Sequence, residues 1–157
     1  MTAPRGFLHA DLTRRLIGLY FDVYKELGGG FLESVYGNAL AMALTSENIR
    51  FAREPEVVIT FRGSNVGLGR PDFIVDKNVI MECKAVQRLE PWHRAQVVHY
   101  LRSSGLRVGL LLNFGPKAEF RRIEIDVSDS GNDNRKRDEG STADCSSRQQ
   151  IILPRGR

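Results

Sequence analysis

Within one short stretch, three charged side chains lie in or beside two otherwise apolar segments that resemble strands, apart from the charges at its start and in the turn between them. The stretch is RPDFIVDKNVIMECK, residues 70–84, and the three side chains are Asp72, Glu82 and Lys84. An unpaired charge buried in a protein core is energetically costly. These positions therefore predict that the charges compensate one another, or that a bound group compensates them.

Strand geometry predicts how these side chains are arranged. Side chains two positions apart on a strand point to the same face, so Glu82 and Lys84 should project together while Cys83 points to the opposite face. A tight turn at Lys77–Asn78 would fold the chain back on itself. Asp72 would then lie beside Glu82 near one end of the hairpin.

Two carboxylates and an ammonium group in one place indicate metal chemistry. Neighbouring carboxylates repel each other unless a positive charge lies between them, and magnesium is typically held by one or two carboxylates together with substrate phosphate. Lysine is not a magnesium ligand, but it can orient or deprotonate a water molecule. The alternative is an ordinary salt bridge of Lys84 on an exposed face, which the apolar setting of both strands disfavours.

Two further polar pairs have helical spacing. Glu33 would lie in the first turn of a helix, with Tyr36 on the same face, and Gln96 and Tyr100 are four positions apart on a later helix. The simpler interpretation of Glu33 is a favourable charge at a helix N-terminus. The simpler interpretation of Gln96 and Tyr100 is a partly buried polar pair.

The elements that would position these residues follow from periodicity. Apolar residues at spacings of three and four, with glycines at 28–30, predict helices over 9–30 and 31–47. The remaining segments are strands at 56–63, 66–76 and 78–86, a helix at 91–105, and strands at 107–115 and 119–127. The first three strands should form an antiparallel meander, and the helix should cross over to a parallel neighbour. The expected fold is α/β, with a mixed sheet flanked by helices.

Length and composition limit the number of domains and the class of protein. The chain has 157 residues, 41% of them hydrophobic, and a net charge of +4, which suits one domain over 8–127 and is compatible with a polyanionic partner. Residues 128–157 are polar and predict a disordered tail. No apolar run is long enough to cross a bilayer, and two cysteines without metal-ligand spacing fit a reducing compartment. We therefore expect a cytoplasmic protein without a membrane partner.

The segment GFLESVY matches the G-x-x-E-x-x-Y signature of the GxxExxY family, which is assigned to the PD-(D/E)XK nuclease superfamily. The similarity extends from about Leu12 to Ile125 and includes RPDFIVD, VIMECKAV, AQVVHYL and GLLLNFG in order. The resemblance implies a restriction-endonuclease-like mixed central sheet flanked by helices.

By position, the resemblance also implies roles for the residues above. Asp72 and Glu82 would bind the metal together with the backbone carbonyl of Cys83, and Lys84 would be the catalytic lysine. Three residues would complete the catalytic site, namely Glu33, Gln96 and Tyr100. The family usually carries a histidine where this chain has Tyr24, which implies one tightly held metal ion or a weaker site. His93 and His99 are expected at the surface or outside the metal's ligand shell.

The expected function is a Mg²⁺-dependent phosphodiesterase acting on DNA, in which a metal-bound water attacks the phosphorus and Mn²⁺ can substitute. Arg70, Arg88 and Arg94 flank the site in sequence and could contact the nucleic-acid backbone. The alternative is a catalytically inactive nuclease-fold module that binds nucleic acid or a protein. A third hypothesis is a nuclease subunit that is silent when isolated. A homodimer or a protein partner would then supply specificity.

Overall fold

The computed structural model describes residues 6–126, which form three α-helices and seven β-strands. The helices are α1 (Ala10–Leu27), α2 (Glu33–Ser46) and α3 (Pro91–Ser104). The strands are β1 (Phe51–Arg53), β2 (Val57–Phe61), β3 (Ser64–Gly69), β4 (Phe73–Val75), β5 (Val79–Lys84), β6 (Val108–Phe114) and β7 (Ala118–Glu124). The predicted tail at 128–157 lies outside the described residues. Among residues 6–126, no helix is long and apolar enough to cross a membrane.

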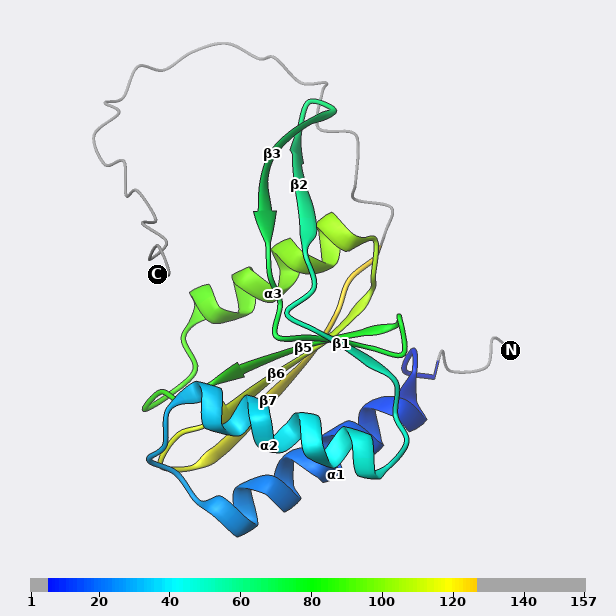
Figure 1. The fold of residues 1–157 in the computed structure, drawn as a ribbon. Coiled ribbons are helices and arrows are strands. Elements are labelled where there is room, and N and C mark those ends of the chain that lie inside the picture. Colours follow the sequence, from blue (N-terminus) through cyan, green and yellow to red (C-terminus); the bar gives the residue numbers. More distant parts are fainter. Residues whose placement is uncertain (1–5, 127–157) are drawn as a thin grey trace, which may run out of the picture.

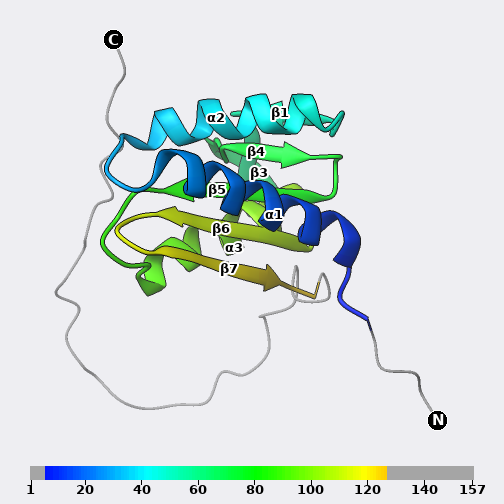
Figure 2. The same ribbon diagram turned by 90° about the horizontal axis from the view of Figure 1, so that it is seen from below.

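Five strands form a mixed central sheet in the order β1-β4-β5-β6-β7. β5 and β6 are parallel, and α3 makes the crossover between them, while every other neighbouring pair is antiparallel. α1 and α2 cover one face of the sheet and α3 covers the other (Figures 1 and 2). The expected α/β fold with a mixed sheet flanked by helices is confirmed.

The core has two parts, one on each face of the sheet. The larger part joins α1 and α2 to the sheet and includes Tyr20, Leu40 and Met81. The smaller part joins α3 to the opposite face and includes Ile80 and Val97. Successive residues of a strand alternate between faces, so β5 contributes to both parts.

The predicted three-strand meander is wrong. The segment 66–76 is divided into β3 and β4 by Arg70–Asp72, and Pro71 has no N–H with which to continue a strand ladder. β2 and β3 pair only with each other, as a hairpin that projects from the body of the protein (Figure 1). The edge of the central sheet is taken by β1, which the sequence did not predict and which pairs with β4.

Candidate active site

Asp72 and Glu82 meet at one end of the β4–β5 hairpin. Phe73 pairs with Met81, so the residue before β4 faces the residue after Met81. The backbone N–H of Asp72 donates to Oε2 of Glu82 at 3.3 Å, and Oδ2 of Asp72 accepts a hydrogen bond from the N–H of Cys83 at 2.7 Å. The structure thus brings the two acids together, as the turn between the strands predicts.

Lys84 and Glu82 form a buried ion pair. Nζ of Lys84 lies 2.9 Å from Oε1 of Glu82, and the two side chains are only 11% and 4% exposed. Both residues share the sheet face that α3 covers, because they alternate with Cys83 along β5. This burial rules out the alternative of a salt bridge on an exposed face. A buried ion pair is weak evidence for a stabilising role, because the cost of desolvating both charges offsets their attraction.

The two carboxylates of the cluster carry more negative charge than the single ammonium group of Lys84 can neutralise. Burial raises the pKa of Glu82 to about 7, and the nearby charge of Asp72 adds to this effect. Burial also raises the pKa of Asp72, against the opposing hydrogen bond from Cys83. Burial alone would lower the pKa of Lys84, but Glu82 and the other carboxylates outweigh it and raise that pKa. The ammonium therefore stays protonated at neutral pH, while both acids favour an additional cation.

Glu33 completes the acidic side of the site from the other layer. It lies in the first turn of α2 and keeps a solvent-exposed surface. Desolvation raises its pKa, Lys84 opposes that shift and Asp72 adds to it. The Glu33 carboxylate therefore lies within electrostatic reach of Lys84 and Asp72.

Tyr36 fixes the turn that leads into Glu33. Its hydroxyl donates to the carbonyl of Gly28 at 2.7 Å and accepts from the N–H of Phe31 at 3.2 Å. Its ring is fully buried and stacks on Phe114 with the ring centroids 4.2 Å apart. Tyr36 thus holds the backbone of the turn that precedes Glu33.

Gln96 and Tyr100 reach the site from α3. Nε2 of Gln96 donates to the hydroxyl of Tyr100 at 3.2 Å, so the predicted polar pair exists. A Cβ atom at Gly69 would lie 2.7 Å from Cε1 of Tyr100, so the glycine lets the ring pack closely against the end of β3. Burial, with a contribution from Glu82, raises the pKa of Tyr100. The pair therefore lies between the base of the hairpin and the acidic cluster.

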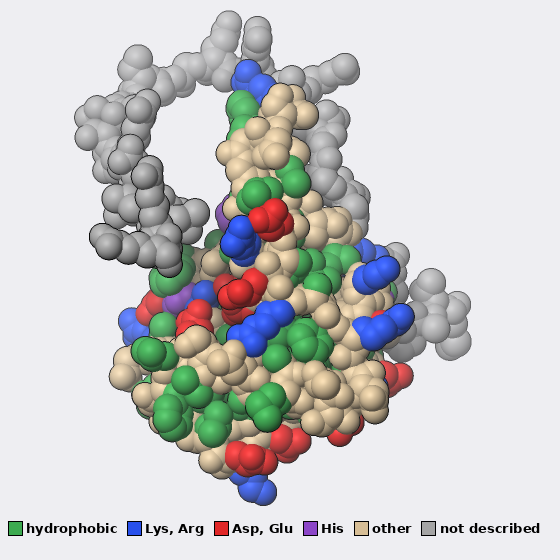
Figure 3. All heavy atoms as spheres, viewed as in Figure 1, with side chains coloured by type: hydrophobic (Ala, Val, Ile, Leu, Met, Phe, Trp, Pro, Cys, Tyr) green, Lys and Arg blue, Asp and Glu red, His purple; other side chains and the backbone are tan. Residues whose placement is uncertain are grey.

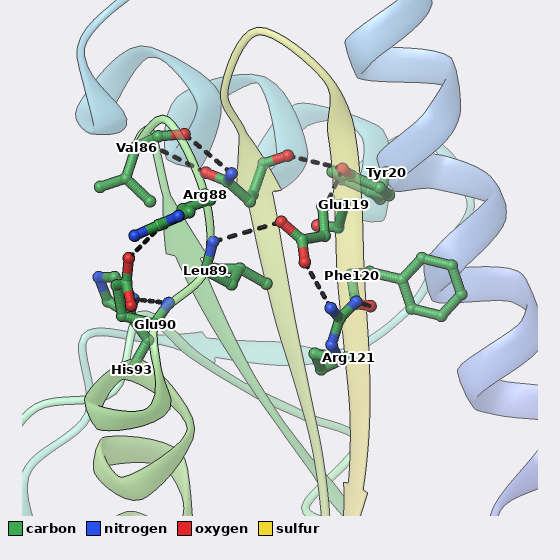
Figure 4. Close-up of polar contacts among 10 residues, drawn as sticks. Tyr20, Val86, Arg88, Leu89, Glu90, His93, Glu119, Phe120 and Arg121 are labelled. Carbon is green, nitrogen blue, oxygen red and sulfur yellow. Dashed lines mark hydrogen bonds and ion pairs between the residues drawn. The ribbon is translucent and has the colours of Figure 1, made fainter.

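The loop after Lys84 is held rigidly, and this fixes the end of β5. The N–H of Val86 donates to Oδ1 of Asn113, whose Nδ2 donates back to the carbonyl of Val86, at 3.0 and 2.9 Å. The N–H of Leu89 donates to Oε2 of Glu119 at 3.2 Å, so the loop is tied to both β6 and β7 (Figure 4). The chain after Lys84 therefore follows a defined course from the end of β5 to α3.

Cys83 has the orientation that its predicted role requires. Its side chain is buried in the core on the face of α1 and α2, and burial raises the pKa of its thiol. Its N–H points to Asp72. The N–H and C=O of one strand residue point to the same side, so its carbonyl also faces Asp72. A backbone ligand is thus compatible with this placement, whereas a nucleophilic thiol is not.

The three arginines predicted to contact nucleic acid are less well placed. Arg70 pairs with Glu56 and Arg88 pairs with Glu90, each at 2.6 Å, and both arginines are exposed. Arg94 lies on the exposed side of α3. The structure brings none of the three into hydrogen-bonding contact with the acidic cluster.

Sequence reasoning missed two residues beside the cluster and left the placement of a third open. That third residue is His93, expected either at the surface or outside the metal's ligand shell; it is 1% exposed, and its Nδ1 accepts from the N–H of Glu90 at 2.8 Å. Burial and the charge of Lys84 lower its pKa. Arg53 and Glu54 line a pocket beside Asp72. Their signal was faint, because β1 is only three residues long and shows no usable periodicity.

The residues present fit a divalent cation by their chemistry. Asp72, Glu82 and Glu33 are oxygen donors of the kind that Mg²⁺ prefers, and burial raises the pKa of each. Within residues 6–126, no group of three or more His, Cys, Asp or Glu side chains is arranged so that it could hold a metal ion, and Oε1 of Glu82 is engaged by Lys84. Oε1 of Gln96 is buried without a partner among the described residues, which fits a polar ligand or water here.

The mixed sheet flanked by helices thus carries two acids and a lysine at one end of the β4–β5 strand pair. A family model of the PD-(D/E)XK nuclease superfamily matches residues 10–123. The chain belongs to this superfamily, a class of hydrolytic nucleases that generally use divalent metal ions. No curated protein matches the chain significantly.

Two solved structures are similar in fold. One is SSO0001, with 21% identity and a TM-score of 0.49 over 60% of this chain and 52% of that one. The chain thus spans about half the length of SSO0001. The other is an alkaline exonuclease from Laribacter hongkongensis, with 12% identity and a TM-score of 0.46 over 82% of this chain and 74% of that one.

Proposed function

We propose that this protein is a Mg²⁺-dependent nuclease of the GxxExxY family that hydrolyses phosphodiester bonds in DNA, with Mn²⁺ able to replace Mg²⁺. The observation that carries the proposal is the buried cluster of Asp72, Glu82 and Lys84, in which both acids have raised pKa values. A protein without metal chemistry has little reason to bury charges that disfavour one another. The cysteine usage and charge pattern favour action in the cytoplasm on a nucleic-acid partner.

The proposed metal site uses Asp72, Glu82 and the carbonyl of Cys83, with Glu33 acting directly or through water. When bound, the cation would neutralise charge that develops on the phosphate and acidify a coordinated water. The hydrogen bond from Cys83 to Asp72 holds one carboxylate in place. The buried position of Glu82 excludes bulk solvent from the same region.

Lys84 is proposed to orient the attacking water and to stabilise negative charge. Its raised pKa keeps Nζ protonated at neutral pH, so the group donates hydrogen bonds more readily than it accepts a proton. This favours the orienting role over the general-base role. Gln96 and Tyr100 are proposed to position substrate or water from α3, since Oε1 of Gln96 has no partner among the described residues.

A second candidate function is a nuclease-fold module that binds a partner without turnover. Exposed apolar side chains on the β2–β3 hairpin support it, including Phe61 and Val66 at 60% and 61% exposure. Two of the three arginines proposed to bind nucleic acid are also occupied by ion pairs. The same hairpin would suit a homodimer or a protein partner that supplies specificity to an active nuclease.

The test is a cleavage assay with labelled single-stranded and double-stranded DNA, and matched RNA, in Mg²⁺, Mn²⁺ or chelator. The test variants are Lys84→Ala and Glu82→Gln. The matched controls are Lys25→Ala and Glu26→Gln, two exposed positions on α1. Metal-dependent cutting that the test variants lose and the controls keep is the expected result. Cutting that survives both test variants would disprove the site. A folded protein that neither cuts nor binds metal would favour the binding module.

A further inference from the structure

A pocket opens beside the acidic cluster, at the junction of α2 with the end of β1. Its volume is about 170 Å³, and it is lined by Glu33, Ser34, Gly37, Arg53, Glu54, Asp72 and Phe73. Two of these residues are the proposed site acids. Arg53 is the one cation among these lining residues, and acidic and basic side chains meet on this surface below the hairpin (Figure 3).

Local packing holds Arg53 over the pocket. Its guanidinium lies 5.7 Å from the ring centroid of Phe73, the first residue after Asp72. A Cβ atom at Gly37 would lie 3.2 Å from Nη2 of Arg53, so the absence of a side chain there makes room for the guanidinium. Contact with the Phe73 ring and the close approach to Gly37 limit the conformational freedom of the guanidinium, but neither occupies its N–H donors.

The backbone reinforces this placement. Glu54 follows directly, has a φ of 48°, and its N–H donates to the carbonyl of Asp72 at 2.8 Å. A non-glycine residue in the left-handed region is uncommon and persists where the surroundings fix it. The corner therefore ties the position of Arg53 to the backbone of a proposed metal-binding residue.

Arg53 also differs from its neighbouring arginines in its partners. Arg50 and Arg70 pair with Asp76 and Glu56 at 2.7 and 2.6 Å. Among the ion pairs of the described residues, none involves Arg53. Burial raises the pKa of Asp72, and the charge of Arg53 is one of the influences that oppose this rise. Its hydrogen-bond donors are therefore available to a ligand that enters the pocket.

We propose that Arg53 binds the non-bridging oxygens of a substrate phosphodiester and so positions the nucleic acid against Asp72. This inference rests on the proposed nuclease function. A planar guanidinium matches two phosphate oxygens in a bidentate arrangement. The nearby acids favour a singly charged phosphodiester over a doubly charged terminal phosphate. The first turn of α2, where Ser34 lies, offers further backbone donors to an anion.

The test measures binding of a short DNA in Mg²⁺ on a Lys84→Ala background, so that turnover does not interfere. The dissociation constant is followed by fluorescence anisotropy over roughly 50 to 200 mM salt. The variants are Arg53→Gln, which removes the charge, and Arg53→Lys, which keeps the charge but loses the planar guanidinium that can donate two hydrogen bonds at once. The matched control is Arg50→Gln, an exposed arginine at the start of the same strand region. Melting temperatures are recorded for all.

We expect Arg53→Gln to weaken binding by about 10- to 100-fold, as for loss of charge-assisted hydrogen bonds. The slope of log affinity against log salt should fall by about 0.7 to 0.9, the value of one phosphate contact. Arg53→Lys should restore the slope but only part of the affinity, because lysine donates as a point charge. Arg50→Gln should change neither quantity.

Two outcomes overturn the proposal and are distinguishable from failure of the proposed function. In the first outcome, Arg53→Gln has the same DNA affinity and salt slope as Arg50→Gln, while the protein with Lys84 intact cleaves DNA. The proposed nuclease function is then supported and the proposed phosphate-binding role of Arg53 is wrong. If Arg53→Gln lowers only the melting temperature, the residue is structural and acts through Phe73. If the intact protein never cleaves but the slope still falls, the subsite stands and the nuclease proposal fails.

Discussion

β5 buries charged side chains, whereas the β2–β3 hairpin exposes apolar ones. All six residues of β5 are buried, and they include Glu82 and Lys84. The hairpin has a single charged residue, Arg62, between Val57 and Gly69, yet most of its apolar side chains face solvent. Composition alone would therefore assign the two segments the wrong way round, with the charged strand outside and the apolar hairpin inside.

The contrast shows that neighbours determine burial more than residue type does. β5 lies at the centre of the sheet between two helical layers, so any side chain on it is buried. A two-stranded sheet with no third strand has little to bury its faces against. Charge buried in β5 costs stability unless it is compensated, whereas apolar surface exposed on the hairpin is available to a partner.

The largest effect expected from this contrast is the loss of cleavage in Lys84→Ala. A group that orients water or transfers a proton contributes roughly 10²- to 10⁴-fold to a rate, and Lys84 is the ammonium group paired with Glu82. Single-turnover cleavage of labelled DNA measures the change. Arg62→Ala, at the exposed hairpin turn, is the control, and an equal loss in both variants would remove the distinction between the two regions.

The pH dependence of stability should follow from the buried acids. The pKa of Glu82 is about 7 in the folded protein and about 4.5 when unfolded, so the folded state binds more protons between these values. The free energy of unfolding of chelator-treated protein should therefore fall as pH rises from about 4.5 to 7, by about 3 kcal/mol. Lys84 adds no slope in this window, because its pKa is raised above 10.5.

Denaturant unfolding at several pH values measures this slope. Glu82→Gln has no carboxyl group at this position, so its profile should be flatter than that of the wild type. Added Mg²⁺ should oppose the fall, because a cation favours the ionised acids. A wild-type profile that rises with pH over this range in chelator would contradict the assigned environment of Glu82.

Removing the hydroxyl of Tyr36 should have an intermediate effect. Tyr36→Phe loses the hydrogen bonds to Gly28 and Phe31 and should cost about 1 to 2 kcal/mol of unfolding free energy. The matched control is Tyr24→Phe, which loses the 3.0 Å bond to the carbonyl of Gly115. If Tyr36 positions Glu33, cleavage should fall more in Tyr36→Phe than in the control. Equal cleavage in the two variants would assign Tyr36 a purely structural role.

The sequence predicted the structure well where the local residue pattern and the tertiary contacts favour the same conformation. The alternation along β5 predicts that Glu82 and Lys84 share a face, and the turn predicts that Asp72 lies beside them, because both signals arise within one hairpin. The crossover between β5 and β6 was also predictable, since a helix between two strands favours a parallel pair.

What the sequence could not supply depends on contacts between distant segments. β1 is too short to show a period, so its pairing with β4 was missed, and with it the position of Arg53 beside Asp72. The break at Pro71 was overlooked because the residues on both sides favour strands. The sequence instead favours arginines near the motif along the chain, and two of these, Arg70 and Arg88, are ion-paired in the structure. Proximity along the chain was a poor guide to proximity in space.

The smallest effect is expected from truncating a hairpin side chain, and a matched pair of valines measures it. Val79 on β5 is fully buried and Val66 on β3 is 61% exposed. Val79→Ala should cost about 2 kcal/mol through lost burial, while Val66→Ala should change stability by less than about 0.5 kcal/mol. Unfolding in denaturant gives both values. A large cost for Val66→Ala that depends on protein concentration would mean that the hairpin is already buried against another molecule in solution.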